Sequence, residues 1–233
     1  IFFIYSNHPD TLWLGTRGGG LAKLNTQTMK AKTYQHVSGD TTTIANNVIK
    51  FIHEDINGYL WIATEMGVSR FDPRIGIFRN FGIDDGLPNN NIWAILPDKE
   101  NNLWLSTNSG IAKIELDSKS NITDIKSYQK NEGLKSLEFS QGAYLRNEVT
   151  GTIYFGGTEG FYAFNPEQIK PRQFEPPVRL TSIKVMDKEL ESDTLPSSKK
   201  EVVIPWNKNF ISFEFVGLDF AHQGNILYKY KMV

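Results

Sequence analysis

One five-residue motif recurs four times along the chain. It reads LWLGT at residues 12–16, LWIAT at 60–64 and LWLST at 103–107, and it returns in a weaker form, IYFGG, at 153–157. The central aromatic residues of these copies are 48, 43 and 50 positions apart. This spacing fits the four-stranded blade of a β-propeller and is longer than a leucine-rich repeat. The chain is therefore predicted to consist of successive copies of one β-sheet unit.

Turn-forming residues flank the motif in every copy. Three positions before the aromatic residue stand residue types that accept positive φ: Asp10, Gly58, Asn101 and Gly151. Six positions before it stand polar side chains that could accept hydrogen bonds from the amides of the turn: Asn7, Asp55, Asp98 and Glu148. Six positions after it come glycines, with one extra glycine in the first copy: Gly19, Gly67, Gly110 and Gly160. Each copy is thus predicted to form two hairpin turns around one apolar strand.

Further strand-like segments complete each unit. A β-like stretch precedes every motif, and stretches rich in β-branched and aromatic residues follow the first three, such as GIFRNFGI at 76–83. The motif strand is apolar on both faces, so both faces must be covered, and a propeller covers them by stacking blades around an axis. The fourth copy runs instead into PEQIKPRQFEPPV at 166–178, whose prolines cannot donate to a β-ladder.

These patterns predict an all-β chain in three parts. Residues 1–166 are expected to form four blades of a larger propeller, and residues 167–176 a proline-rich linker. Residues 177–233 contain four strand-like runs with period-two alternation, at 178–187, 201–206, 210–220 and 226–233. They are predicted to form part of an immunoglobulin-like β-sandwich, since their 57 residues fall short of the roughly 100 in a complete one. A self-contained four-bladed propeller closed by residues 1–5 is the alternative.

Composition excludes several classes of protein. The net charge is −1, and the Lys and Arg residues are scattered, so no nucleic-acid partner is expected. No apolar run is long enough to span a bilayer, and the chain contains no Cys. Because the sequence also begins without Met, we expect a piece of a longer protein that meets a membrane only through a segment outside this chain.

The sequence offers no catalytic or metal-binding motif. The histidines at positions 8, 36, 53 and 222 have no ligand spacing and are interpreted as surface residues. The acidic pair Glu54 and Asp55 could serve a glycoside hydrolase, but Asp55 occupies the repeated turn position. We therefore predict no catalytic residues, no metal and no cofactor.

A ligand site is expected at one end of the blades. In a propeller, the turns between second and third strands and the connections between blades emerge on the same face. The polar and aromatic residues predicted there are Arg17, Glu65, Asn91, Trp93, Asn108 and Glu159. Amides, carboxylates and an indole suit the hydroxyl groups and apolar faces of sugars. The alternative is that these residues are ordinary solvated loop residues and that Trp93 packs between blades.

Three segments of the chain resemble two known families. DINGYLWIATEMGVSRF and DKENNLWLSTNSGIAKI are similar to the two-component regulator propeller repeat, and NKNFISFEFVGLDFAHQGNILYKYKMV, with Tyr228 and Tyr230, resembles the start of a three-tyrosine domain. The resemblance implies the periplasmic sensor region of a hybrid histidine kinase anchored in the inner membrane, with seven-bladed propellers. It also implies an oligosaccharide ligand and signalling to glycan-utilisation genes.

Three functions can be compared with these features. A sensor region without catalytic activity of its own, whose parent is a histidine kinase, agrees best with the repeats and the sandwich. A carbohydrate-active enzyme would need a catalytic cluster, and a protein-binding scaffold of the WD type would show a GH…WD signature, which is missing. Self-association, as a homodimer or otherwise, is also expected, because an open arc of blades leaves apolar faces uncovered.

Overall fold

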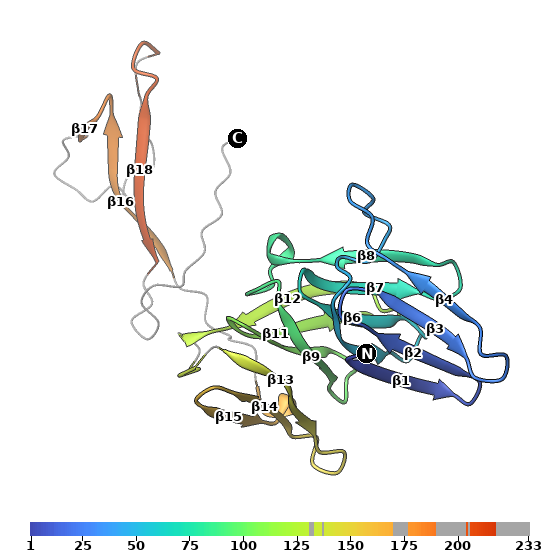
Figure 1. The fold of residues 1–233 in the computed structure, drawn as a ribbon. Helices are drawn as coiled ribbons and strands as arrows, with labels where there is room; N and C mark the ends of the chain where they lie inside the picture. The colour runs from blue at the N-terminus through green and yellow to red at the C-terminus, as the bar shows by residue number, and fades with distance from the viewer. Residues whose placement is uncertain (131–132, 137, 170–176, 190–203, 205, 218–233) are drawn as a thin grey trace. The chain divides into compact units, whose positions relative to one another are not determined.

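The computed structural model describes residues 1–130, 133–136, 138–169, 177–189, 204 and 206–217. The chain divides after Ile169 into two units, each described separately below. The regular structure of the described residues is β-strand apart from short 3₁₀ turns, including Ile83–Asp85 and Pro166–Gln168 (Figure 1). The predicted all-β fold is confirmed.

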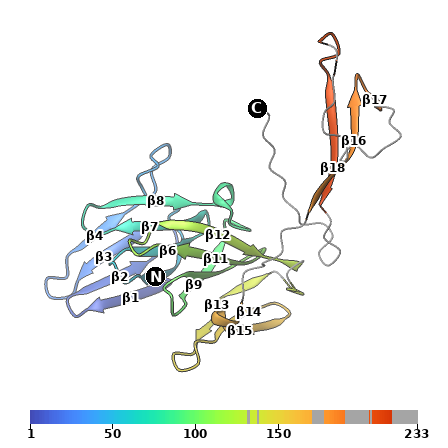
Figure 2. The same ribbon diagram turned by 180° about the vertical axis from the view of Figure 1, so that it is seen from behind.

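Four antiparallel sheets follow one another in the first unit, and they are called blades 1 to 4 (Figures 1 and 2). Blade 1 contains β1 (Phe3–His8), β2 (Thr11–Gly15), β3 (Leu21–Asn25) and β4 (Ala31–Tyr34). Blade 2 contains β5 (Ile49–Glu54), β6 (Leu60–Thr64), β7 (Gly67–Asp72) and β8 (Ile77–Phe81). Blade 3 contains β9 (Ile92–Pro97), β10 (Leu103–Thr107), β11 (Gly110–Leu116) and β12 (Ile122–Tyr128). Blade 4 contains β13 (Phe139–Arg146), β14 (Ile153–Gly157) and β15 (Gly160–Phe164).

The first strand of each blade packs against the first strand of the next one. β1 contacts β5, β5 contacts β9, and β9 contacts β13. Aromatic side chains from these strands meet: the ring centroid of Phe51 lies 4.5 Å from that of Phe3 and 4.9 Å from that of Tyr144. Residues 3–5 pair with β2 of blade 1, so the alternative in which residues 1–5 close blade 4 is wrong.

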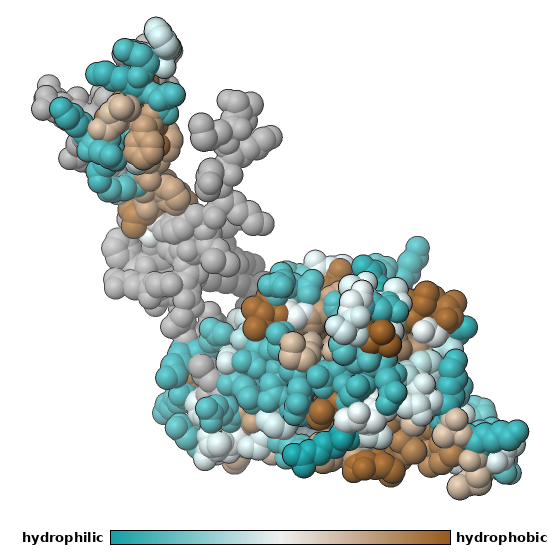
Figure 3. All heavy atoms as spheres, turned by 45° about the horizontal axis from the view of Figure 1, so that its top comes forward, coloured by the Kyte–Doolittle hydropathy of each residue, from teal (hydrophilic) through white to brown (hydrophobic). Residues whose placement is uncertain are grey.

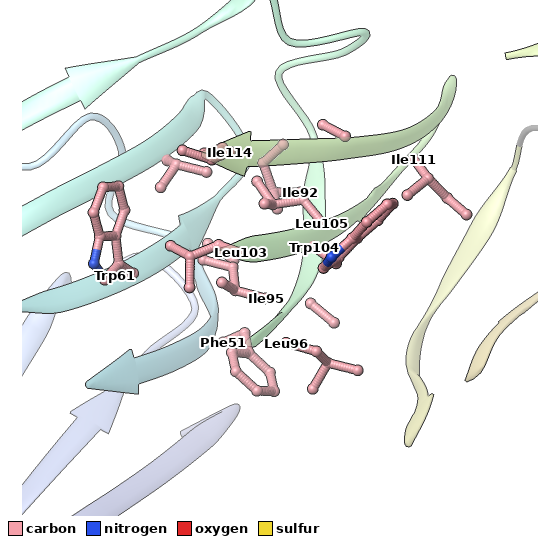
Figure 4. Close-up of a cluster of buried hydrophobic side chains, with 14 of the residues drawn as sticks. Phe51, Trp61, Ile92, Ile95, Leu96, Leu103, Trp104, Leu105, Ile111 and Ile114 are labelled. Carbon is pink, nitrogen blue, oxygen red and sulfur yellow. The ribbon is translucent and has the colours of Figure 1, made fainter. Parts of the chain in front are cut away.

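The recurring motif fills the spaces between blades. Trp13 packs at the edge of the Phe71 ring, 5.7 Å away in blade 2. Trp61, one copy later, belongs to the buried cluster that includes Leu103 and Leu105 of blade 3 (Figure 4). Successive side chains of a strand point to opposite faces, so one motif serves both neighbouring blades. This explains why the motif strands of blades 2 and 3 are buried at every position.

The polar residues of the repeat close its turns. The hydroxyl of Thr64 accepts from the amide of Met66 at 3.0 Å and donates to the carbonyl of Gly67 at 2.8 Å, and Thr107 makes the same pair of bonds.

Asp55 accepts from backbone amides, as predicted, and also from the indole N–H of Trp61. The sequence had not indicated this indole bond, which Asp98 makes with the tryptophan of blade 3.

The turn glycines allow the fourth strand of a blade to approach closely. A Cβ on Gly67 or Gly110 would lie 2.2 or 2.3 Å from a carbonyl oxygen of the fourth strand, and both residues have positive φ. In the first copy Gly20 occupies this position, because one inserted glycine shifts the turn by one residue. The spacing had instead pointed to Gly19.

His53 corrects another prediction. It is half-buried within β5, where it pairs with Trp61, and its Nε2 atom is buried without a hydrogen-bond partner. Burial lowers the pKa of His53 to about 4, with Asp55 opposing and Arg146 adding to this effect. The histidine lies in a strand that packs against β1 and β9, so its side chain is only partly accessible to solvent.

The second unit contains a three-stranded antiparallel sheet in the order β17, β16, β18. These strands are β16 (Val178–Val185), β17 (Lys188–Glu189) and β18 (Ile211–Gly217). Two of the predicted strands correspond to β16 and β18. The predicted strands at 201–206 and 226–233, with Tyr228 and Tyr230, lie mostly or wholly outside the described residues.

Candidate ligand-binding site

A buried lysine lies at the junction of blades 2 and 3. Lys50 occupies a register irregularity of β5, between Ile49, which pairs with Thr64, and Phe51, which pairs with Ala63. Such bulges redirect a side chain out of the regular alternation. The residue is only 4% exposed. Its ammonium group therefore needs partners, and blades 2 and 3 supply them.

Three predicted site residues surround the Lys50 ammonium group. A carboxylate oxygen of Glu65, in the turn between β6 and β7, lies 3.5 Å away. The ring centroid of Trp93, in β9, lies 3.7 Å away, in the geometry of a cation–π contact. The side-chain oxygen of Asn91, just before β9, accepts a hydrogen bond from the same group. The structure thus brings together residues that are far apart in the sequence.

A fourth predicted residue joins this group through the indole. The N–H of Trp93 donates to the side-chain oxygen of Asn108 at 2.7 Å, in the turn between β10 and β11. Asn108 is exposed, Asn91 and Trp93 are half-buried, and the Glu65 side chain is 49% exposed. We call Lys50, Glu65, Asn91, Trp93 and Asn108 the Lys50 cluster.

Two opposing effects act on the charge of Lys50. Burial lowers the pKa of Lys50, and the neighbouring Glu65 carboxylate opposes this shift without cancelling it. One cation is matched by one carboxylate, so the cluster carries no net charge while both are ionised. Its outward-facing polar groups are the half-exposed carboxylate of Glu65 and the amide of Asn108.

The other two predicted residues lie apart from the Lys50 cluster. The guanidinium of Arg17 lies 5.7 Å from the ring centroid of Phe2, in blade 1. Glu159 is exposed in the turn between β14 and β15, and within the described part of the chain no hydrogen bond or ion pair joins it to the cluster. Of the six predicted residues, four therefore gather around Lys50, whereas Arg17 and Glu159 form no hydrogen bond, ion pair or ring contact with these four among the described residues.

A repeated register explains both the missed lysine and the misplaced glutamate. In blades 1 to 3, the residue four positions after the motif aromatic contacts the residue eleven positions before it. These pairs are Arg17 with Phe2, Glu65 with Lys50, and Asn108 with Trp93. In blade 4 the same register places Thr158 and Ala143 at these two positions. Glu159, the predicted site residue, lies one position after Thr158 and therefore outside the register. Counting back eleven positions would have found Lys50.

The described residues display no metal site and no membrane-spanning helix. No group of three or more His, Asp or Glu side chains among them could hold a metal ion. No helix in the part of the chain that the structure describes is long and apolar enough to cross a bilayer.

The family comparison falls on this region of the chain. Residues 43–66 and 86–109 match the family model of the two-component regulator propeller. This confirms the resemblance to that repeat, and both segments run from a blade connection to the following turn. Together they contain every residue of the Lys50 cluster.

A curated relative matches the whole chain. Histidine kinase P4 from Formosa agariphila is 28% identical over 292 residues, and the alignment covers 100% of this chain and 21% of the relative. This chain therefore spans about a fifth of the length of the relative.

Solved structures share the fold. The extracellular domain of a hybrid two-component system from B. thetaiotaomicron is 22% identical, with a TM-score of 0.51 over 91% of this chain and 27% of that one. PorZ, a surface component of the type-IX secretion system of Porphyromonas gingivalis, is 17% identical, with a TM-score of 0.52 over 74% of this chain and 26% of that one.

Proposed function

We propose that this chain is the ligand-sensing part of the extracytoplasmic region of a hybrid two-component histidine kinase, and that its ligand is an oligosaccharide from polysaccharide breakdown. The propeller repeats and the histidine kinase relative support the sensor assignment. The proposal places the protein in the periplasm, attached to the inner membrane by a segment outside these residues. In this proposal residues 1–166 form propeller blades, residues 167–176 form a linker, and residues 177–233 form part of a sandwich domain.

The observation that carries the ligand assignment is the Lys50 cluster. Sugars combine apolar C–H faces with hydroxyl groups that donate and accept hydrogen bonds. Trp93 offers a half-buried indole surface, while Glu65 and Asn108 offer acceptors and an amide donor beside it. Because Glu65 already offsets the charge of Lys50, the cluster should favour uncharged oligosaccharides over uronate-containing ones of the same length.

Calorimetric titration of the chain with matched neutral and uronate oligosaccharides tests this proposal. Saturable heat with a neutral oligosaccharide is the expected result. Binding of uronates alone would keep the sensor proposal but contradict the charge argument. If no oligosaccharide gives a heat of binding, the proposed ligand class is wrong for this chain, and a peptide or protein ligand would then be tested.

The variant Lys50→Met is expected to weaken oligosaccharide binding at least tenfold. Methionine keeps the apolar stem but removes the cation that orients Glu65 and Trp93. The free energy of unfolding should change by about 1 kcal/mol or less, because the variant no longer buries an ammonium group and the Glu65 carboxylate, whose side chain is 49% exposed, stays solvated.

Lys126→Met is the matched control for this variant. Lys126 pairs with Glu115 at 2.7 Å on the outer strands of blade 3, away from the cluster. The Lys126→Met variant should bind oligosaccharides with the same affinity as the unaltered chain. Equal affinity in both variants, measured by the same titration, would show that the Lys50 cluster does not bind the ligand.

Self-association is proposed to use the uncovered faces of the end blades. Leu145 and Tyr154 pair on the face of blade 4 that no described blade covers, and Leu145 is 59% exposed. In blade 1, Ile4 pairs with Leu14 on the opposite free face. In the view of Figure 3, apolar side chains are scattered among hydrophilic ones, so exposed apolar residues of the end blades, such as Leu145 and Ile4, are candidates for the contact.

Leu145→Glu is expected to shift the sedimentation coefficient of the chain toward that of a monomer. A carboxylate on this face would have to be desolvated in any association that buries it. Val149→Glu introduces the same charge at a 90% exposed turn position and should leave the association unchanged. A sedimentation coefficient that is already that of a monomer before substitution would refute the proposed self-association.

A further inference from the structure

The turn between β5 and β6 contains the single Asn-Gly pair of the sequence, Asn57 and Gly58. In such a pair the backbone amide nitrogen of the glycine can attack the side-chain carbonyl carbon of the asparagine, since glycine has no Cβ to shield that nitrogen. Asparagine is accordingly a thermolabile residue type. The pair follows the end of β5, whereas Lys50 lies near its start, so this turn is separate from the Lys50 cluster.

The reaction needs no partner other than water. The Gly58 nitrogen forms a bond to the side-chain carbonyl carbon of Asn57, and the side-chain nitrogen leaves as ammonia with the proton that Gly58 gives up. Water then opens the resulting cyclic imide at either of its carbonyl groups. The products are aspartate and isoaspartate at position 57, and each carries a carboxylate that is ionised at neutral pH.

The folded turn holds the attacking nitrogen. The N–H of Gly58 donates to the carbonyl of Asp55 at 3.0 Å, and the N–H of Asp55 donates to the carbonyl of Tyr59 at 3.0 Å. The Asp55 carboxylate also accepts from the amide of Asn57 at 2.9 Å. The peptide unit between Asn57 and Gly58 therefore cannot rotate toward the Asn57 side chain without breaking the turn.

Blade 3 holds the leaving group. The side-chain nitrogen of Asn57 donates to the carbonyl of Ser118 at 3.1 Å and to the hydroxyl of Ser120 at 2.8 Å. Both serines lie in the turn between β11 and β12, so these bonds join a turn of blade 2 to a turn of blade 3. Asn57 is half-buried in this contact, and Ser120 is fully buried.

A buried arginine fixes the acceptor. The guanidinium of Arg70, in β7, donates to the carbonyl of Ser120 and lies 4.7 Å from the ring centroid of Tyr59. Arg70 is only 8% exposed. Blade 2 therefore holds the serine in place from a second strand, and the Ser120 hydroxyl stays within reach of Asn57.

We propose that Asn57 is a deamidation site and that the contact between blades 2 and 3 controls its conversion. While this contact is closed, the nucleophile and the leaving group are both held in hydrogen bonds, and conversion is slow. When the two turns separate, the Gly58 nitrogen reaches the side chain and conversion proceeds as in an unfolded chain. Aspartate and isoaspartate therefore accumulate with each opening of the junction.

Conversion also removes bonds that close the junction. The amide of Asn57 donates to both serines, whereas a carboxylate can only accept. The carbonyl of Ser118, which cannot donate, would then face a carboxylate oxygen. Isoaspartate in addition lengthens the main chain within a tight turn. A converted chain is therefore expected to open more readily, so opening and conversion promote each other.

Peptide mapping by mass spectrometry tests the proposal in the whole chain. The chain is incubated at mildly alkaline pH, once in buffer and once unfolded in guanidinium chloride at the same pH. Aspartate and isoaspartate at position 57 are then quantified over time. Conversion in the folded chain should be at least about tenfold slower, because three hydrogen bonds must open first.

Ser120→Ala is the decisive variant, and Ser118→Ala is its matched control. Ser120→Ala removes the hydroxyl that accepts from Asn57, so conversion in the folded chain should become about three- to tenfold faster, the effect of one hydrogen bond. Ser118 accepts through its main-chain carbonyl, which alanine keeps, so this control should convert at the original rate. Hydrogen exchange of the β6 amides in the same samples shows whether each variant is folded.

Any of three results would overturn the proposal. Absence of conversion at Asn57 in the unfolded chain would show that it is not a deamidation site. Equal rates in the folded and unfolded chains would show that the blade contact does not control conversion. An unchanged rate in folded Ser120→Ala, or an equal acceleration in Ser118→Ala, would show that the bond between Asn57 and Ser120 is not the control.

Discussion

Replacing Asp55 with alanine should lower the free energy of unfolding by about 3–5 kcal/mol. The buried carboxylate accepts from the indole N–H of Trp61 at 2.8 Å and from the amides of Asn57 and Tyr59 at 2.9 and 3.1 Å. Alanine removes these charge-assisted bonds and leaves the indole N–H of a fully buried tryptophan without a partner. Denaturant unfolding measures the loss.

Asp117→Ala is the matched control for Asp55→Ala. Asp117 accepts from the amides of Lys119 and Asn121, each at 2.8 Å, so its turn has the same bonding pattern. The Asp117 side chain is exposed, and no indole among the described residues donates to it. The control should cost about 1 kcal/mol or less, because water replaces the lost partners. Equal losses in the two variants would contradict a special role for the buried aspartate.

Acidification from pH about 6.5 to about 4 should remove about 3 kcal/mol of stability through His53 alone. Burial in β5 lowers the pKa of His53 to about 4, whereas an unfolded histidine titrates near 6.5. Between these values the unfolded state binds a proton that the folded state does not. The stability that His53 contributes is therefore fully present above pH 6.5 and falls as the pH falls. The loss is nearly complete near pH 4.

His53→Leu separates this effect from the titration of carboxylates. Leucine cannot take up a proton, and the Nε2 that it removes has no hydrogen-bond partner. The free energy of unfolding of this variant, measured by urea denaturation at pH 7, 6, 5 and 4, should fall less steeply than that of the unaltered chain. Val149→Ala, at an exposed position that cannot take up a proton, should leave the original slope. An unchanged slope in His53→Leu would refute the prediction.

Much of the fold could be predicted because its determinants are local. The motif strand, the turn glycines and the acidic turn residues act within one blade, so their spacing in the sequence is enough to identify them. The threonine hydroxyls of LWIAT and LWLST close the turn that directly follows them. Gly19 was the exception, because one inserted residue moves the functional position to Gly20.

The candidate site could be predicted only in part. Glu65, Asn91, Trp93 and Asn108 were identified from the face on which their loops emerge, and they do meet. Lys50 was missed because it lies in a strand, where a polar residue gives no sign that a bulge redirects it toward the next blade. The placement of Glu159 in the same ring stays a prediction without a contact to support it.

The sequence by itself determined the repeated blade, its turns and its all-β class, since strand periodicity and turn chemistry depend on neighbours a few residues away. Only the tertiary structure decided which side chains from different blades share one environment. Stacking of the blades buries Lys50, half-buries His53 and places the ammonium group of Lys50 beside Glu65. Burial and charge pairing depend on groups that are distant along the chain, and for this reason no local pattern could specify them.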